Sequence, residues 1–261
     1  MSIVSQGDKF LLHWLDLSRA HRILWLLEIL ELNYDVKVYL REETTWRAPA
    51  ELASVHPSGK SPILEIFHAD GSPPLKLAES GYIIQYLIQN YDIHKILTPS
   101  DPRDRERVNY YLHYSEGTLQ NLLVSILVNN VARQLAPTGT KFVAKFVTNA
   151  INSAYYVQEW KLNMDNLEYA LRKEGTGYFV GKHLTAADII LSFPIYENVF
   201  DNEEEVQKFS GRKINLSKTY PNLYAWSSMV RDDPLYIKID EQMEDLVREK
   251  IAKEAARKRR R

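Results

Sequence analysis

The feature that most constrains this chain is a single change of pattern near residue 100. Up to residue 91, short apolar runs that favour strands alternate with stripes of helical spacing. After residue 103, nearly every segment has the spacing of an amphipathic helix. We therefore expect an α+β chain made of two domains, a small α/β domain followed by an all-helical one.

The first 90 residues predict the order strand, helix, strand, helix, strand, strand, helix. A short apolar run at 10–14 precedes a helical stripe at 20–30, and residues 34–40 alternate with period two. A strand, helix, strand unit implies a right-handed crossover and a parallel pair of strands. The segments HPSGKSPILEIF and GSPPLKL each lead from turn residues into a short apolar run, which predicts a hairpin.

Composition sets the domain boundaries. Residues 1–91 are expected to form the α/β domain and residues 92–102, which include two prolines, the linker. Residues 103–247 are expected to form the helical domain, within which the polar segment 201–217 is interpreted as a loop. Residues 248–261 form a basic tail, interpreted either as a frayed helix end or as a contact for an anionic membrane.

Charge and cysteine content exclude several classes of function. The net charge of −1 combines +6 in the tail with −7 in the remainder, and an acidic body argues against nucleic-acid binding. The absence of cysteine excludes disulfides and any thiol chemistry of the chain's own. No apolar run reaches the roughly 18–20 residues of a membrane span, and the N-terminus lacks a secretory signal pattern, so a cytoplasmic location is expected.

Three short motifs could bind a peptide-like ligand, although each has an ordinary structural alternative. Ser61 precedes Pro62 at the start of a predicted strand, where a cis bond would turn its backbone toward an extended ligand. The alternative is an ordinary strand-start proline. Glu79 and Ser80 open a predicted helix, whose N-terminus attracts carboxylates, or they simply cap it.

Ser18 has the same ambiguity at the first predicted helix. It occupies the expected N-cap position, where a hydroxyl could also stabilise a thiolate brought by a ligand. Lys60 and Arg47 offer positive charge for a second ligand carboxylate, or are solvated surface residues. Thr185 and Asp188 form a variant capping box with a structural role. The seven histidines show no paired spacing typical of a metal site, so no metal is expected.

Four segments together resemble one family over nearly the whole chain. They are SRAHRILWLLEIL, HPSGKSPILE, LAESGYIIQYL and YFVGKHLTAADIILSF. In this order and spacing they resemble the glutathione transferases, with a fungal type of first helix and theta-like features at its start. The resemblance implies a thioredoxin-like domain that binds glutathione as co-substrate, and a helical domain with a pocket for an apolar co-substrate.

The resemblance also implies roles for individual residues. Ser18, or its neighbour Arg19, would stabilise the glutathione sulfur as a thiolate. The backbone of Ser61 would pair with the cysteinyl unit. Glu79 and Ser80 would hold the γ-glutamyl end, Lys60 and Arg47 would meet the glycine carboxylate, and Tyr110 and Tyr114 would hold the apolar co-substrate.

The function implied is that of a detoxifying, stress-response transferase that attacks hydrophobic electrophiles with the glutathione thiolate. The same thiolate could reduce organic peroxides. The alternative is a glutathione-binding regulatory or interaction protein of the same fold with little catalysis. The resemblance also implies a homodimer.

Overall fold

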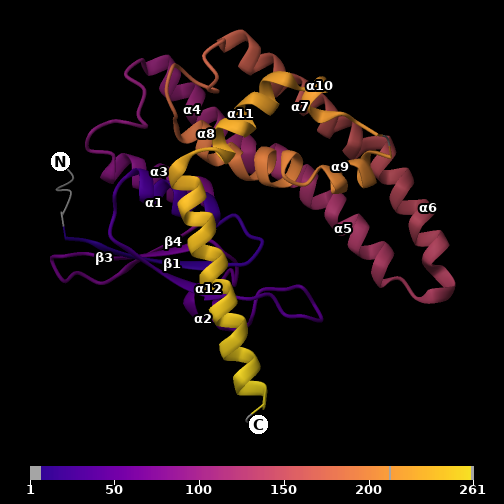
Figure 1. The fold of residues 1–261 in the computed structure, drawn as a ribbon, viewed down its shortest axis with the longest axis horizontal. Coiled ribbons are helices and arrows are strands. Elements are labelled where there is room, and N and C mark those ends of the chain that lie inside the picture. The colour runs from indigo at the N-terminus through magenta and orange to yellow at the C-terminus, as the bar shows by residue number, and fades with distance from the viewer. Residues whose placement is uncertain (1–6, 212, 260–261) are drawn as a thin grey trace. The chain divides into compact units, whose positions relative to one another are not determined.

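The computed structural model describes residues 7–211 and 213–259 and divides the chain into two compact units. The first unit contains the chain up to Thr98 together with the segment from Arg231 onward, and the second runs from Pro99 to Val230 (Figure 1). The predicted linker at 92–102 does contain the division. The prediction that the helical domain continues to residue 247 is wrong, because the last helix packs within the first unit.

The first unit is built on a four-stranded sheet with the order β2-β1-β3-β4. Its strands are β1 (Lys9–Leu15), β2 (Tyr34–Tyr39), β3 (Ile63–Phe67) and β4 (Leu75–Ala78), and its first helices are α1 (His21–Ile29), α2 (Glu51–Val55) and α3 (Ser80–Tyr91). β1 and β2 are parallel, whereas β1–β3 and β3–β4 are antiparallel. This order confirms the predicted crossover and hairpin, and with them a thioredoxin-like domain.

Apolar side chains explain why these elements form. Leu12 in the central strand is fully buried, and Ile23, Leu24 and Leu27 form the predicted buried stripe of α1. The predicted linker is more ordered than its composition suggests. The carboxylate of Asp92 accepts hydrogen bonds from the backbone N–H groups of residues 96 and 97 and from the hydroxyl of residue 98, which ties down the chain after α3.

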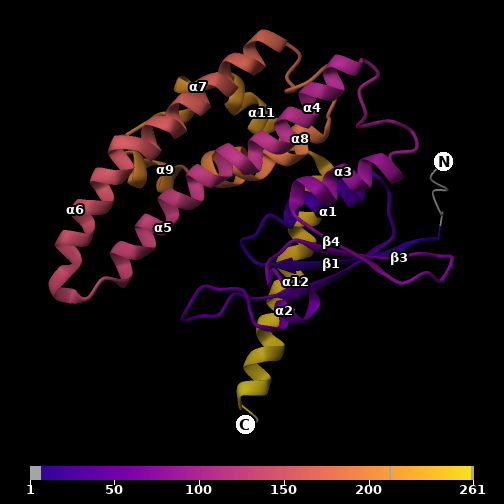
Figure 2. The same cartoon turned by 180° about the vertical axis from the view of Figure 1, so that it is seen from behind.

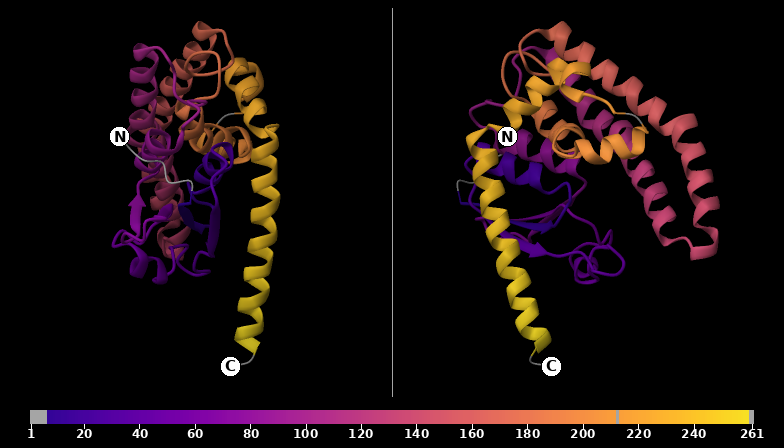
Figure 3. Two further views of the ribbon diagram at one scale, coloured as in Figure 1. Left: turned by 90° about the vertical axis from the view of Figure 1, so that its left-hand side faces the viewer. Right: turned by 45° about the vertical axis from the view of Figure 1, so that its right-hand side comes forward.

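The C-terminal helix α12 (Pro234–Arg259) completes the first unit. It contacts α1 and β2, and it runs along this unit and continues past the sheet (Figure 3). The indole of Trp25 donates to Asp233 at 3.0 Å, and Tyr236 packs edge-on against the same ring. Because Ile239 and Met243 are buried, the first half of this helix forms part of the core of the unit.

The second unit is entirely helical within its described residues. Its α-helices are α4 (Pro102–Tyr114), α5 (Asn121–Leu135), α6 (Lys141–Ile151), α7 (Val157–Glu174), α8 (Ala186–Leu191), α9 (Glu203–Ser210), α10 (Leu216–Thr219) and α11 (Pro221–Arg231). π-Helical turns follow α4, α6 and α8, so the long helices expected from periodicity are continuous but locally widened. Helices α5 and α6 form a long hairpin (Figure 2).

The segment 201–217 is not the loop that its polarity predicts. It contains α9 and the start of α10, while residue 212 lies outside the described residues. Three glutamates fill the first turn of α9, where carboxylates stabilise a helix, and Gly211 ends it with a φ of +68°. Val206 is fully buried and the ring of Phe209 packs edge-on against Trp160, so two apolar contacts anchor a helix that is otherwise largely solvated.

The predicted capping box at α8 is confirmed. The Thr185 hydroxyl accepts from the amide of Ala187 at 3.3 Å, and Asp188 accepts from the Thr185 amide at 2.9 Å. The carboxylate of Asp188 also accepts from the amide of Phe179 at 3.1 Å and the indole of Trp226 at 2.9 Å. This buried residue therefore joins the start of α8 to α11 and to the loop before α8.

Candidate functional site

The structure brings two of the predicted site residues, Ser18 and Ser61, into direct contact. Their hydroxyl oxygens lie 3.2 Å apart, although 43 residues separate them in the chain. Ser18 lies in the turn between β1 and α1, and Ser61 lies directly before β3, the antiparallel neighbour of β1. Because the strands are adjacent, the turn at the end of β1 meets the entry to β3.

Ser18 is not the N-cap of α1, which corrects the sequence prediction. The helix begins at His21 with Ala20 in the N-cap position and without a side-chain cap. The Ser18 hydroxyl instead accepts from the amide of Ala20 at 3.3 Å, and the residue is 7% exposed. The turn before it includes Leu17 at a φ of +50°. Ser18 therefore lies in a turn beside the start of the helix, and its hydroxyl does not cap the helix.

The side chain of Ser61 is anchored on the backbone of β1. Its hydroxyl donates to the carbonyl of His13 at 2.9 Å and accepts from the amide of Leu15 at 3.2 Å. The Ser61–Pro62 peptide bond is cis, as the family resemblance implied. The sequence analysis considered only the backbone of Ser61, so the contact of its hydroxyl with Ser18 is a finding of the structure.

Glu79 and Ser80 occupy the start of α3, as predicted. Glu79 is the N-cap residue with a φ of +71°, and its exposed side chain makes no capping hydrogen bond. A left-handed φ costs a residue other than glycine about 1 kcal/mol or more, and such conformations are concentrated at binding sites. Ser80 is buried in the first turn. The helix terminus and the free carboxylate thus lie side by side.

Lys60 and Arg47 are both exposed, and Arg19 beside Ser18 is half-buried. Arg47 closes the loop after β2 through its backbone, with its carbonyl accepting from the amide of Glu42. Within residues 7–211 and 213–259, no hydrogen bond or ion pair joins the side chain of Lys60 or Arg47 to another predicted site residue. Their assignment therefore stays a prediction.

Tyr110 and Tyr114 lie one turn apart on α4 with their rings stacked, 5.5 Å between centroids. Tyr110 is 58% exposed. Tyr114 is more enclosed, and its hydroxyl donates to Asn163 on α7 at 2.7 Å. Burial raises the pKa of the Tyr114 phenol above its ordinary value. Tyr110 offers an open ring face, whereas Tyr114 supports it.

A buried polar network in β1 escaped the sequence analysis. The imidazole of His13 meets the hydroxyl of Tyr39 at 2.8 Å and the carboxylate of Glu65 at 2.6 Å, and Lys76 pairs with Glu65 at 3.2 Å. Burial lowers the pKa of His13, against the opposing effect of Glu65. A histidine inside an apolar strand run was the signal for a buried polar partner on a neighbouring strand.

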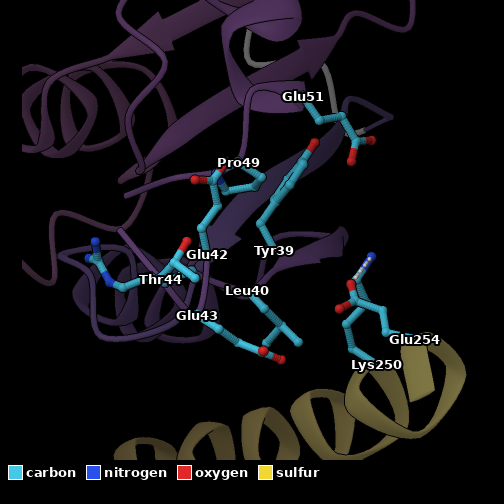
Figure 4. Close-up of a pocket in the computed structure, with 10 residues that line it drawn as sticks. Tyr39, Leu40, Glu42, Glu43, Thr44, Pro49, Glu51, Lys250 and Glu254 are labelled. Atoms are coloured by element: carbon cyan, nitrogen blue, oxygen red, sulfur yellow. Dashed lines mark ion pairs between the residues drawn. The ribbon is translucent and has the colours of Figure 1, made fainter. Parts of the chain in front are cut away.

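The first unit also contains a polar pocket of about 410 Å³ that none of the predicted site residues lines. It lies between the loop after β2 and α12 (Figure 4). Its wall includes the carboxylates of Glu42, Glu43, Glu51 and Glu254, with Lys250 paired to Glu254 at 3.5 Å. This excess of carboxylates disfavours an anionic peptide, so the pocket is not the candidate site.

The described residues offer neither a metal site nor a membrane-spanning helix. In the described part of the chain, no group of three or more His, Asp or Glu side chains could hold a metal ion. No helix in the same residues is long and apolar enough to cross a membrane.

Comparison with known proteins gives the same result for both units. Residues 18–90 match a family described as "Glutathione S-transferase, N-terminal domain", and residues 140–238 match "Glutathione S-transferase, C-terminal domain". Glutathione S-transferase 1 of Saccharomyces cerevisiae is 36% identical over 86% of this chain and 91% of its own length. Glutathione S-transferase 3 of Schizosaccharomyces pombe is 31% identical over 90% and 88%.

A solved structure agrees with these relatives. The crystal structure of a glutathione S-transferase from Actinobacillus pleuropneumoniae has a TM-score of 0.65 and 31% sequence identity. The match covers 90% of this chain and 93% of that one.

Proposed function

The chain belongs to the glutathione S-transferase family, and we propose that it is a glutathione transferase whose first unit binds and ionises glutathione. The observation that carries the proposal is the pair of serine hydroxyls, 3.2 Å apart, where the turn after β1 meets the entry to β3. The ionised sulfur then attacks an electrophilic carbon of an apolar co-substrate. No metal takes part in this chemistry.

Each part of glutathione has a matching group in the first unit. Glu79 can pair with the γ-glutamyl ammonium, and the N–H groups at the start of α3 can bind the neighbouring carboxylate. Lys60 and Arg47 supply positive charge for the glycine carboxylate at the other end. The cysteinyl unit lies between these ends, against the backbone of Ser61, with its sulfur at Ser18.

Ser18 lowers the pKa of the thiol by donating a hydrogen bond to the thiolate. A free thiol has a pKa of about 8.5, so only a few per cent is ionised at pH 7. A hydrogen bond to a charged group contributes roughly 1.5–3 kcal/mol, which lowers the pKa by about 1–2 units. Arg19, adjacent in the chain, is the second candidate for this role.

Glutathione binding and turnover test the proposal. Titration calorimetry measures binding of glutathione, and a panel of aryl halides, enals and organic peroxides then measures turnover. Binding with turnover of at least one electrophile supports a transferase, and turnover of peroxides would add a reductase activity. Binding without turnover of any of them would favour the regulatory alternative, and no binding would reject the proposed site.

The α5–α6 hairpin supports a homodimer. Exposed apolar side chains recur at a spacing of four along both helices: Leu127, Val131 and Leu135 on α5, and Phe142 and Phe146 on α6. Monomeric proteins rarely leave so large an apolar face uncovered. Light scattering is expected to give about twice the chain mass of 30.4 kDa. Exchanging both phenylalanines for serine should shift the mass toward the monomer, whereas Ile237→Ser on α12 should not.

A cytoplasmic location with weak contact of the basic tail to anionic membranes completes the proposal. Part of the tail's charge is already paired along α12, since Arg248 contacts Glu244 at 2.7 Å and Lys253 contacts Glu249 at 2.9 Å. Attachment should therefore be weak and electrostatic. Sedimentation with phosphatidylserine vesicles should show binding at low salt and release at high salt. Retention at high salt would contradict this mechanism.

A further inference from the structure

The other hydrogen bonds of Ser61 determine which hydroxyl donates in its contact with Ser18. A serine hydroxyl has one proton and two lone pairs. The carbonyl of His13 can only accept, so it takes the Ser61 proton at 2.9 Å. The amide of Leu15 can only donate, so it fills one lone pair of Ser61 at 3.2 Å. The remaining lone pair faces Ser18, so the Ser18 hydroxyl is the donor in the 3.2 Å contact.

The contact between the two hydroxyls is weak enough to be exchanged. Hydrogen bonds between hydroxyl groups usually measure about 2.7–2.8 Å, so a contact of 3.2 Å is long. Hydrogen bonds to an ionised acceptor are roughly twice as strong as those between neutral groups. A thiolate beside Ser18 would therefore take its proton away from Ser61, while the Ala20 amide continues to hold the Ser18 oxygen.

We propose that the Ser61 side chain is a positioning residue that reverses its hydrogen bond when bound glutathione ionises. The inference rests on the proposed function, in which Ser18 donates to the sulfur. Once the Ser18 proton turns to the sulfur, the two hydroxyl oxygens face each other through lone pairs. Rotating the Ser61 proton from the His13 carbonyl to Ser18 removes this repulsion.

The reversed arrangement is a chain of donors that all point toward the sulfur. The Leu15 amide donates to Ser61, Ser61 donates to Ser18, and Ser18 donates to the thiolate. The thiol proton leaves to solvent, and each serine keeps its own proton, so no covalent bond of the protein changes. Each hydrogen bond polarises the next and strengthens it by roughly 10–30%. Ser61 therefore stabilises the thiolate without touching it.

The test is the pKa of glutathione bound to variants at Ser61, read from thiolate absorbance against pH at saturating glutathione. Ser61→Ala is expected to raise this pKa by roughly 0.1–0.6 unit, which is the cooperative share of the effect of Ser18. Ser61→Thr and Ser61→Val form a matched pair of equal size. The threonine variant should keep the wild-type pKa and the valine variant should raise it. If the alanine variant does not fold, this pair still shows whether the hydroxyl at position 61 lowers the pKa of bound glutathione.

Combination with Ser18→Ala separates the two proposals. If Ser61 acts through Ser18, removing its hydroxyl should have no further effect in the Ser18→Ala background. If Ser61→Ala shifts the pKa of bound glutathione equally in the wild type and in Ser18→Ala, Ser61 does not act through Ser18 and the proposal is rejected. The proposal is also rejected if Ser18→Ala raises this pKa but Ser61→Ala leaves it unchanged or lowers it. A wild-type pKa in Ser18→Ala itself would reject both the relay and the proposed role of Ser18.

Discussion

Asp188 and Ser18 are both buried polar residues at the start of a helix, yet their hydrogen bonds differ in kind. The carboxylate of Asp188 accepts four hydrogen bonds of 2.9–3.1 Å from Phe179, Thr185 and Trp226. Ser18 has contacts of 3.2 and 3.3 Å with neutral partners. The Asp188 carboxylate, which stabilises the fold, is fully occupied by hydrogen bonds shorter than those of Ser18. The Ser18 hydroxyl, to which we assign a chemical role, keeps a proton that can turn to another acceptor.

The largest expected effect is the loss of stability on removing Asp188. Asp188→Ala leaves the Phe179 amide and the Trp226 indole buried without an acceptor, at about 1–3 kcal/mol each. Unfolding in urea should show a loss of about 3–5 kcal/mol, with a smaller loss for the isosteric Asp188→Asn. Ser18→Ala should lose less than about 1 kcal/mol. Similar losses at both sites would contradict the distinction between them.

Acid provides a second way to separate folding from chemistry. Burial lowers the pKa of His21, three residues after Ser18, to about 4. Because the unfolded value is about 6.5, the folded state keeps this imidazole neutral. Its contribution to stability is complete above about pH 6.5 and is lost as pH falls toward 4, by roughly 3 kcal/mol. Urea unfolding at several pH values checks this.

The control for the acid experiment is His21→Gln, which cannot titrate. Its stability should fall less steeply than that of the wild type over the same pH range. If both proteins lost stability with the same slope, His21 would not be the group responsible. Activity should instead follow the thiol pKa near and above pH 6.5, so the two pH profiles should not coincide.

Ser18→Ala should reduce kcat/KM by about 8- to 25-fold at pH 7, because the thiolate fraction falls with the loss of about 1–2 pKa units of stabilisation. Steady-state kinetics with a reactive aryl halide measures this, and calorimetry should show that glutathione still binds. Ser18→Thr keeps the hydroxyl and serves as the control. A decrease of less than about fivefold with intact binding would point to Arg19 or a backbone amide as the main stabiliser.

The smallest expected effect is at the apolar co-substrate. Tyr110→Ala removes an exposed ring that stacks on Tyr114, and should raise KM for an apolar electrophile about two- to fivefold while leaving glutathione affinity unchanged. Tyr169→Ala on α7 removes a similarly exposed ring, 54% against 58%, and is the matched control. Equal KM values for both variants would show that Tyr110 does not bind the apolar co-substrate.

Local patterns predicted the parallel crossover, the hairpin, the helical unit and the capping box, because each depends on periodicity or on residues a few positions apart. The last helix was assigned to the wrong unit because its core contacts, such as Trp25 with Asp233, join residues 208 positions apart. The polar segment 201–217 was misread because its apolar residues are few and widely spaced, although Val206 and Leu216 are buried and Phe209 packs against Trp160.

The candidate site was predictable only residue by residue. The family resemblance identified Ser18 and Ser61 separately, but their contact depends on the adjacency of β1 and β3. Nothing in the local sequence indicates that the Ser61 hydroxyl is anchored on the backbone of His13 and Leu15. The same adjacency hid the His13–Glu65 pair, whose partners lie 52 residues apart.

The most direct test of the account is the pKa of the glutathione thiol bound to the wild-type protein, measured by thiolate absorbance from pH 5 to 9. If the Ser18 hydroxyl donates to the sulfur, this pKa should lie about 1–2 units below the value of about 8.5 for the free thiol, and most of the shift should be lost in Ser18→Ala. A bound thiol that titrates near 8.5 in the wild type would contradict the account, because the serine pair would then hold the turn and do nothing to the sulfur.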